Sequence, residues 1–370
     1  MSYWLNKFGP LLGLLLVYAF FAVVAPPTFR SVGNLELMAR QTAVVGTATV
    51  GMTLVIITAG IDLSVGSLVA LTTMIIAFLL NQQFPPLIAA LAGVGSAALF
   101  GLVNGTIVIG HLGRVAAICL GIGTLVGLLR WPALGTSPAG WASGILAGLV
   151  IGSLVLWFNE RFMKRIPVTP FIVTLAMLLV VRGFAKLLGN EQKINAPRTW
   201  LKELLSTLPA EWNWMLLPPG VWALGLLAAL AGVLLYYTKL GRHIFAVGSN
   251  EKTARLCGVA VERVKLYVYT LCGATAGLAG LLQFSRLNIG DPVSAVGLEL
   301  DVIAAVVIGG GSLSGGEGSI LGSLVGALIM TVIRSGCTQW GLPNYTQEII
   351  TGTIIVCAVA LDRLRHQPAE

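Results

Sequence analysis

The chain has 370 residues, of which 56% are hydrophobic and only 10% are charged, and its mean hydropathy is +0.88. Soluble domains average about 25% charged residues, so this composition excludes an ordinary soluble protein and predicts an all-α polytopic membrane protein. The net charge of +8 would suggest nucleic-acid binding in a soluble chain, but basic cytoplasmic loops account for it in a membrane protein. We expect no nucleic-acid partner.

The apolar segments indicate how often the chain crosses the membrane. A spanning helix needs about 20 mostly apolar residues. Such runs lie near residues 8–25, 42–59, 64–81, 86–109, 114–130, 138–158, 170–188, 214–237, 264–285, 301–311, 319–334 and 346–361. They predict about 10–12 transmembrane helices in a single transmembrane domain over residues 1–370. The first run lacks a convincing cleavage site, so we interpret it as a retained helix rather than a signal peptide.

Acidic residues near the membrane interior are candidates for a transport pathway, because a charge is costly there. Asp62, Glu299 and Asp301 lie at the edges of apolar runs. Asp62 and Ser64 precede a predicted helix, so capping is the simpler role for Asp62. Glu299 and Asp301 open another helix, where acids suit the helix dipole. We therefore predict that these four residues are polar groups of the pathway or of the structure.

The basic loops predict which ends of the helices face the cytoplasm. Stretches 238–265 and 160–165 and the tail after Asp362 are all rich in Lys and Arg. The positive-inside bias places all three in the cytoplasm. The loop 189–213 must then face outward, although it also carries lysine and arginine.

The polar loop 238–265 contains a predicted short helix in the stretch SNEKTARLCGV. Asn250 or Ser249 can cap its start, and Glu251 in the first turn suits the helix dipole. Gly258 can end it. A short helix between two spans can dock into a partner protein, and it can equally be an ordinary solvated connector.

The apolar run 301–311 is too short to cross about 30 Å of hydrocarbon, and GGGSLSGGEGS follows it at once. Irregular backbone at membrane depth is tolerated only where protein or a water-filled cavity surrounds it. We therefore predict a discontinuous or re-entrant segment near 301–334, with a tight glycine-rich turn inside a transporter core. The glycines of this turn are Gly309, Gly310, Gly311, Gly315 and Gly316.

Within this turn, the string LSGGE at residues 313–317 resembles the signature loop of ABC-type ATPases. Such enzymes also need G-x-x-x-x-G-K-[ST], in which backbone N–H groups and a lysine hold the phosphates. No lysine of this chain follows a glycine, so an ATPase is not predicted. The scattered cysteines and histidines predict no metal site and no cofactor, and no membrane-enzyme motif is present.

Small residues recur where the glycine-rich turn leads into the next helix. Gly318, Gly322 and Gly326 fall at every fourth residue and therefore on one helix face. Such a face lets two backbones approach closely. Close static packing is the favoured interpretation, and a moving helix interface is the alternative.

Several stretches together resemble the permease subunits of bacterial ABC importers for monosaccharides, of the ribose, xylose and arabinose type. The resemblance covers most of the chain in the family's order. The stretches are RQTAVVGTATVGMTLVIITAGIDLSVGS (40–67), PFIVTLAMLLVVRG (170–183), GRHIFAVGSNEKTARLCGVAVERVK (241–265), LELDVIAAVVIGGGSLSGGEGSILGSLVGALIM (298–330) and QEIITGTIIVCAVALD (347–362).

The resemblance implies a transport subunit rather than an enzyme, in the bacterial inner membrane and surrounded by membrane lipid. Implied partners are an ABC ATPase, a periplasmic or lipid-anchored sugar-binding protein, a second permease copy (identical or related) and a monosaccharide. The loop 238–265 would be the cytoplasmic coupling loop that contacts the ATPase. This role would fall on Gly248, Ser249, Asn250, Glu251, Ala254, Arg255 and Gly258.

The chain departs from the family between residues 110 and 160, where two additional hydrophobic segments form a possible inserted helix pair. Members of the family typically have ten spans, so twelve are possible here. An autonomous secondary transporter of a small polar solute is the alternative function. The sequence offers no clear intramembrane acid–base pair for proton coupling, which disfavours that alternative.

Overall fold

The computed structural model describes residues 2–110, 150, 153, 168–207 and 215–365. The predicted helix pair at 110–160 and the basic stretch 160–165 fall almost entirely outside the described residues. That part of the prediction therefore stays a prediction, and so does the total of 10–12 spans.

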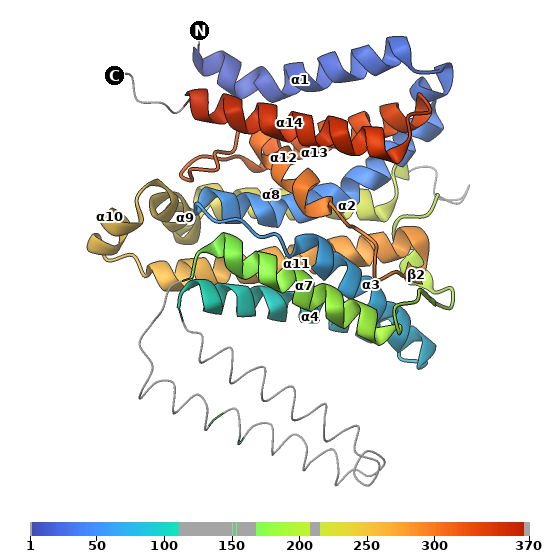
Figure 1. The fold of residues 1–370 in the computed structure, drawn as a ribbon, viewed down its shortest axis with the longest axis horizontal. Helices are drawn as coiled ribbons and strands as arrows, with labels where there is room; N and C mark the ends of the chain where they lie inside the picture. Colours follow the sequence, from blue (N-terminus) through green and yellow to red (C-terminus); the bar gives the residue numbers. More distant parts are fainter. Residues whose placement is uncertain (1, 111–149, 151–152, 154–167, 208–214, 366–370) are drawn as a thin grey trace.

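Helices make up nearly all of the described chain (Figure 1). The longer helices are α1 (Ser2–Val24), α2 (Val32–Ile57), α3 (Val65–Asn81), α4 (Pro86–Val108), α7 (Pro170–Leu188), α8 (Pro219–Tyr237), α11 (Val261–Leu287), α13 (Ile320–Gln339) and α14 (Asn344–Arg365). The shorter elements are η1 (Pro27–Arg30), η2 (Trp200–Leu204), α9 (Lys239–Ser249), α10 (Glu251–Leu256), α12 (Leu298–Ile308) and the two-residue strands β1 (Ile194–Asn195) and β2 (Ile289–Gly290). The strands pair antiparallel, with Ile194 opposite Gly290.

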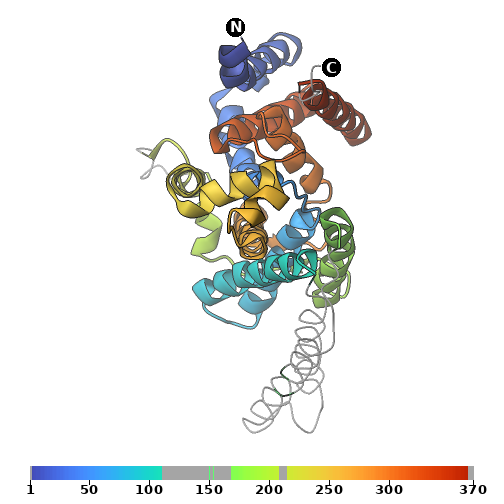
Figure 2. The ribbon, with the colours of Figure 1, turned by 90° about the vertical axis from the view of Figure 1, so that its left-hand side faces the viewer.

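The long helices lie roughly side by side in one bundle, and Figure 2 views this bundle from one end. Six of the described helices are long and apolar enough to cross a membrane: α2, α4, α7, α8, α11 and α13. Stretches of α1 and α3 are also apolar but shorter. This architecture confirms the predicted all-α polytopic membrane fold.

Helix α2 runs through the centre of the bundle, and most of its residues are buried. Helices α4 and α11 pack with their backbones in close contact, because Gly101 lies against Gly273. A Cβ atom added at Gly273 would come within 2.9 Å of the Gly101 Cα. Apolar side chains gain little by leaving lipid, so such close glycine contacts are an important source of helix association in membranes.

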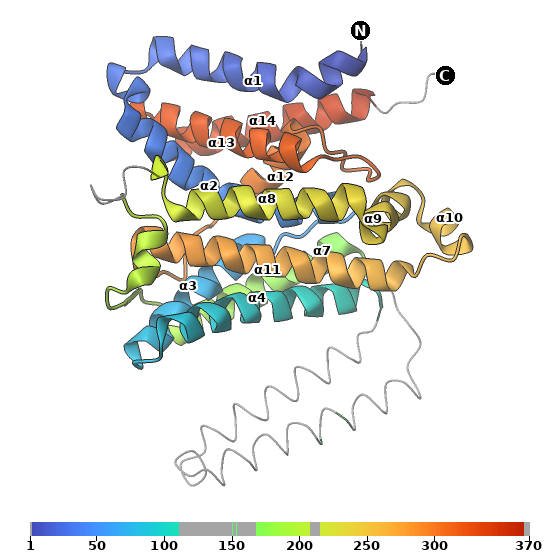
Figure 3. The same cartoon turned by 180° about the vertical axis from the view of Figure 1, so that it is seen from behind.

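Helices α9 and α10 lie together at one end of the bundle, which we call the α10 end (left in Figure 1, right in Figure 3). The C-terminal end of α14 lies at the same end, whereas the described part of loop 189–213 lies at the opposite end. Two of the three basic segments predicted to share one side of the membrane, 238–265 and the described start of the C-terminal tail, therefore lie at the same end of the bundle. The loop 189–213, predicted to face the other side, lies at the opposite end of the bundle.

Helices α3 and α12 begin in the middle of the bundle rather than at its ends (Figure 1). An irregular buried segment, 58–64, leads from α2 into α3, and a second segment, 291–297, leads into α12. The starts of the two helices meet where Gly66 of α3 packs against Glu299 of α12. Protein surrounds most of segment 58–64, whereas segment 291–297 exposes Val293 and Val296. Irregular backbone in a membrane is tolerated where it is buried in protein or lines a water-filled cavity.

The short helix predicted at 301–311 is confirmed, with bounds at 298–308. The irregular backbone inside the bundle lies before this helix, however, and the glycine-rich turn after it lies at the α10 end (Figure 1). The irregular backbone was predicted after α12 because the glycines lie there. The segment 291–297, which precedes α12, contains no glycine run and was therefore not predicted to be irregular. The glycines allow the chain to reverse direction between α12 and α13.

The glycines on the first turns of α13 pack against fixed neighbours. Gly322 lies against Gly309, and Gly326 lies against the carbonyl of Ala305. Gly318 packs on the Ile57 side chain. These contacts favour the predicted close static packing.

Candidate functional site

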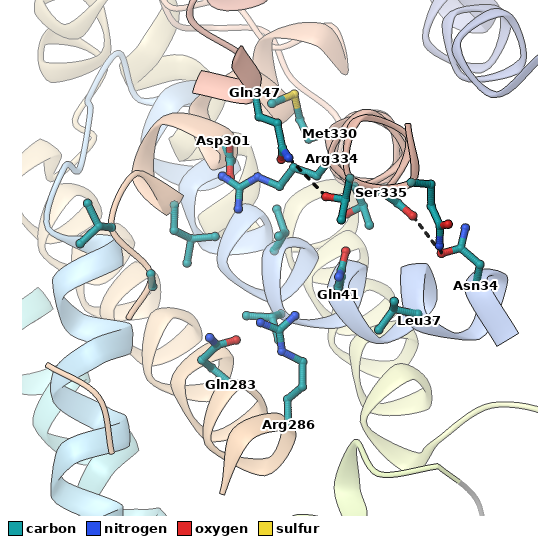
Figure 4. A pocket seen from close by; sticks show the side chains of 18 residues that line it. Asn34, Leu37, Gln41, Gln283, Arg286, Asp301, Met330, Arg334, Ser335 and Gln347 are labelled. Carbon is teal, nitrogen blue, oxygen red and sulfur yellow. Dashed lines mark hydrogen bonds and ion pairs between the residues drawn. The ribbon is translucent and has the colours of Figure 1, made fainter. Parts of the chain in front are cut away.

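A polar pocket lies between five helices in the half of the bundle away from the α10 end (Figure 4). Its volume is about 310 Å³, at the lower limit of about 300 Å³ for small-molecule sites. Most of its lining residues are polar or charged, although the helices that carry them are mainly apolar. The lining residues are Asn34, Leu37, Gln41, Val44, Val45, Gln283, Arg286, Ala295, Val296, Leu298, Asp301, Met330, Thr331, Arg334, Ser335, Thr338, Gln339 and Gln347.

The helical repeat explains how single polar residues gather here. On α2, Asn34 and Gln41 lie seven positions apart, which is two helical turns, and therefore on one face. On α13, residues 331, 334, 335 and 338 are all polar and lie three or four positions apart. Each helix thus contributes one polar stripe, and the pocket forms where the stripes of α2, α11 and α13 meet.

Some polar side chains of the pocket already have protein partners. The Ser335 hydroxyl donates to the Asn34 Oδ1 at 3.0 Å, and the Asn34 amide donates to the Phe29 carbonyl at 2.8 Å. Asp301 forms an ion pair with Arg334. The Asp301 side chain is only 2% exposed, whereas that of Arg334 is 48% exposed. Arg334 thus lies between the pocket and the buried Asp301 carboxylate, with which its guanidinium is paired.

Three other polar side chains, Gln41, Gln283 and Arg286, make no hydrogen bond or ion pair within the described part of the chain. Gln283 is buried, and Arg286 is partly buried. In Figure 4, Gln283 and Arg286 extend from α11 towards α2, which carries Gln41. The side-chain amides can donate to hydroxyl groups and accept from them, whereas the guanidinium can only donate to them. The pocket can therefore bind a small, hydroxyl-rich solute.

Sequence reasoning missed these three residues, because a lone polar residue in an apolar helix carries no motif. The available signal was their spacing. Gln283 and Arg286 are three residues apart within one apolar run, and Gln41 lies seven residues after Asn34. Polar residues on one face of a spanning helix indicate a polar neighbour in the bundle.

A second polar group, around Asp62, is fully buried beneath the start of α3. The Asp62 Oδ1 accepts from the Ser64 N–H at 3.0 Å and from the Ser64 hydroxyl at 2.6 Å. The Asn104 amide donates to the Ser64 Oγ at 2.9 Å. The N-cap of α3 is Ser64, so the prediction that Asp62 caps this helix is wrong, and Asp62 instead holds Ser64 in a turn just before the helix. None of these three residues lines the pocket.

Glu299 also lies outside the pocket lining, at the junction of α12 with Gly66 of α3. Arg182 braces the segment that precedes α12, because its Nη1 donates to the carbonyls of Pro292 at 3.0 Å and Ser294 at 2.8 Å. Of the four polar residues predicted for the pathway, only Asp301 reaches the pocket. Its role in transport stays a prediction.

At the α10 end, the loop 238–265 folds into two short helices at a sharp angle (Figure 3). The Asn250 Oδ1 accepts from the Thr253 N–H at 2.9 Å, so the predicted cap of α10 is confirmed. Gly258 ends this helix with a φ of +83°. Val259 N–H donates to the Ala254 carbonyl at 3.0 Å, which completes the usual glycine-ended helix turn.

Ion pairs hold α10 on the first turns of α11. Arg255 binds Glu262 at 2.6 Å and Glu251 at 3.7 Å. Lys265 binds Glu251 at 2.7 Å. The hydrogen bond and charge of Glu262 raise the pKa of Arg255 above its already high usual value, so the guanidinium stays charged. These exposed pairs are individually weak, but together they fix the direction of α10.

The outer surface of α10 carries an exposed apolar residue. Leu256 is 88% exposed, whereas Ala254 on the inner side is buried. The Leu256 side chain is therefore available to bury apolar surface against a partner protein. Leu256 was not among the predicted coupling residues, which came from the resemblance to the family.

The glycine-rich turn lies directly against the end of α9. Gly316 N–H donates to the Ile57 carbonyl at 2.9 Å. A Cβ atom at Gly248 would overlap that same carbonyl oxygen and come within 2.6 Å of the Gly316 nitrogen. Gly315 and Gly316 have φ values of +86° and +79°, which glycine adopts readily. We call this contact of Ile57, Gly248, Gly315 and Gly316 the glycine junction.

Comparison with known proteins identifies the family. Residues 107–359 match the family model described as branched-chain amino acid transport system / permease component. The chain is 34% identical to the ribose import permease protein RbsC of Escherichia coli K12, covering 98% of this chain and 95% of that protein. The chain belongs to this permease family.

Other relatives of this permease carry the names of different sugars. It is 31% identical to the xylose transport system permease protein XylH of Haemophilus influenzae, covering 95% of this chain and 94% of that one. It is also 31% identical to the fructose import permease protein FrcC of Rhizobium meliloti, covering 96% and 84%. No solved structure matches the permease significantly. Together with its apolar helices, this membership makes it a multi-pass protein of the bacterial inner membrane.

Substitution of Asp62 tests the buried polar group. We expect Asp62→Leu to destabilise the permease by about 1–3 kcal/mol for each buried donor left unpaired. Asp62→Asn keeps an oxygen in place of Oδ1 and is expected to cost much less. Thermal unfolding of the detergent-solubilised protein measures the difference. Equal losses in the two variants would show that the hydrogen bonds of Asp62 contribute little to stability.

Proposed function

We propose that this permease is the transmembrane subunit of an ABC importer that moves a monosaccharide, a pentose or hexose such as xylose or ribose. ATP is hydrolysed on a separate ATPase subunit, and a periplasmic or lipid-anchored binding protein delivers the sugar. A second permease copy, identical or related, completes the pathway. The names of the relatives support the sugar class, and the hydroxyl-binding chemistry of the pocket agrees with it.

The observation that carries this proposal is that the same two helices reach both the pocket and the coupling loop. Helix α2 lines the pocket through Gln41 and ends at Ile57 in the glycine junction. Helix α12 lines the pocket through Asp301 and leads into the glycine-rich turn of the same junction.

Helices transmit displacement as rigid rods, and packed contacts switch between discrete arrangements rather than deform continuously. A movement of α9 and α10 by the ATPase would therefore shift α2 and α12 and change the access to the pocket. In this mechanism, Gly248 and Ser249 form the inner contact of the loop. Asn250, Glu251, Ala254, Arg255 and Gly258 shape and hold α10. The residue that touches the ATPase is Leu256.

Reconstitution distinguishes this proposal from an autonomous carrier. We expect proteoliposomes with the permease, its ATPase and the binding protein to accumulate labelled xylose or ribose only when ATP is supplied. The permease alone is expected to show no uptake under an ion gradient. Uptake by the permease alone would instead establish a secondary transporter.

Leu256 provides a direct test of the coupling loop. We expect Leu256→Ser to reduce co-purification of the ATPase by about tenfold or more, because full burial of a leucine side chain contributes about 1.5–3 kcal/mol and about 1.4 kcal/mol is a tenfold change in affinity. Leu216→Ser is the matched control, since Leu216 is 81% exposed and precedes α8, which begins at the end opposite to α10 (Figure 1). Affinity purification from membranes with quantified subunits measures both. Normal co-purification of the ATPase with the Leu256→Ser variant would show that Leu256 of α10 does not contribute to the ATPase interface.

A further inference from the structure

The pocket has more positive than negative charge. Its ionisable lining residues are Arg286, Arg334 and Asp301, two arginines and one aspartate. Asp301 and Arg334 pair with each other, so their charges compensate. The charge of Arg286 is left without an opposite charge among the lining residues.

The surroundings of Arg286 do not supply the missing charge. The charged side chains that act on it are Arg334 and Arg40, which are both positive. Arg40 has its own partner, Glu36, at 3.5 Å. Within the described residues, Arg286 has no hydrogen bond or ion pair, although it is partly buried. A partly buried guanidinium without a counter-charge is unfavourable, and a bound anion would relieve this cost.

The start of α12 lines the pocket through Ala295, Val296 and Leu298. It adds little positive charge of its own, because Glu299 and Asp301 lie in its first turn and offset the helix dipole. The two uncharged amides, Gln41 and Gln283, lie beside Arg286 and can bind hydroxyl groups. The pocket thus combines one site for a negative group with sites for hydroxyl groups.

We propose that this pocket accepts a monosaccharide with a carboxylate, a sugar acid, in preference to the matching neutral sugar, and that Arg286 binds the carboxylate. Gln41 and Gln283 bind its hydroxyl groups. A planar guanidinium matches a carboxylate with two parallel hydrogen bonds, which sets the orientation of the sugar ring. This assignment of the substrate class rests on the proposed importer function.

A matched pair of probes isolates the carboxylate. D-Glucuronate and D-glucose differ only at C6, where one has a carboxylate and the other a hydroxymethyl group. We expect the full-length permease in nanodiscs of zwitterionic lipid to bind labelled D-glucuronate about tenfold or more tightly than D-glucose. Arg286→Gln is expected to remove this preference, and Arg286→Lys, which keeps the charge, to retain part of it.

The controls separate the possible causes. Arg198→Gln removes an exposed arginine that does not line the pocket and is expected to leave the preference unchanged. Equal binding of the two sugars, or a preference that survives in Arg286→Gln, would overturn the inference. Loss of glucuronate binding on addition of anionic phospholipid would also overturn it, since Arg286 would then bind a lipid headgroup. Binding requires no ATPase, so these outcomes are independent of the ATP-driven uptake that tests the importer function.

Discussion

Gly248→Ala is expected to abolish sugar uptake by the complete importer, with a loss of about a hundredfold or more, while the permease still reaches the membrane. The added methyl group would overlap the Ile57 carbonyl and come within 2.6 Å of the Gly316 nitrogen. All of these contact atoms belong to the backbone, so no side chain can move aside. Overpacking of this kind costs roughly 1–3 kcal/mol, and here the strain falls on the contact that joins the coupling loop to α2 and α12.

The control for this prediction is Gly232→Ala on α8. A methyl group added at Gly232 meets no atom within 4 Å, and alanine is the better helix former by about 1 kcal/mol. ATP-driven uptake in vesicles and the amount of permease in the membrane are measured for both variants. Near-normal uptake by Gly248→Ala would show that the glycine junction can open without loss of coupling.

The coupling loop is the part of the site that local sequence predicts well. The Asn250 cap, the first-turn Glu251 and the terminating Gly258 act within a few residues of one another. Their geometry therefore follows from short-range rules that need no knowledge of the fold. The exposure of Leu256 could not be obtained in this way, because it depends on how α10 lies relative to α9 and α11.

The glycine-rich turn shows where such reasoning stops. Its sequence predicts a chain reversal, and the positive φ values of Gly315 and Gly316 agree. The requirement for glycine at 248, however, comes from backbone contacts with Ile57 and Gly316, which lie 191 and 68 residues away in the sequence. No local pattern contains those contacts. The pocket could be predicted even less from local sequence, because its lining residues come from five helices that meet only in the folded protein.

The ion pair between Asp301 and Arg334 provides the second large effect. We expect Arg334→Gln to destabilise the permease by about 2–3 kcal/mol. Removal of one partner from a fully buried pair costs about 3–5 kcal/mol, because the remaining charge is left without compensation. The half-exposed side chain of Arg334 lowers this value, since water screens part of the interaction.

A double-mutant cycle separates this pair from other effects of the substitutions. Asp301→Asn removes the buried charge, so the Asp301→Asn, Arg334→Gln double variant is expected to be more stable than Arg334→Gln alone. Thermal unfolding in detergent measures all four proteins. If the two single losses simply add, the carboxyl of Asp301 does not depend on Arg334, and the pair is not what holds α12 against α13. If the double variant recovers stability, a buried charge at the start of α12 is kept in place by one arginine beside the pocket. Arg286 then remains the guanidinium available to a bound solute.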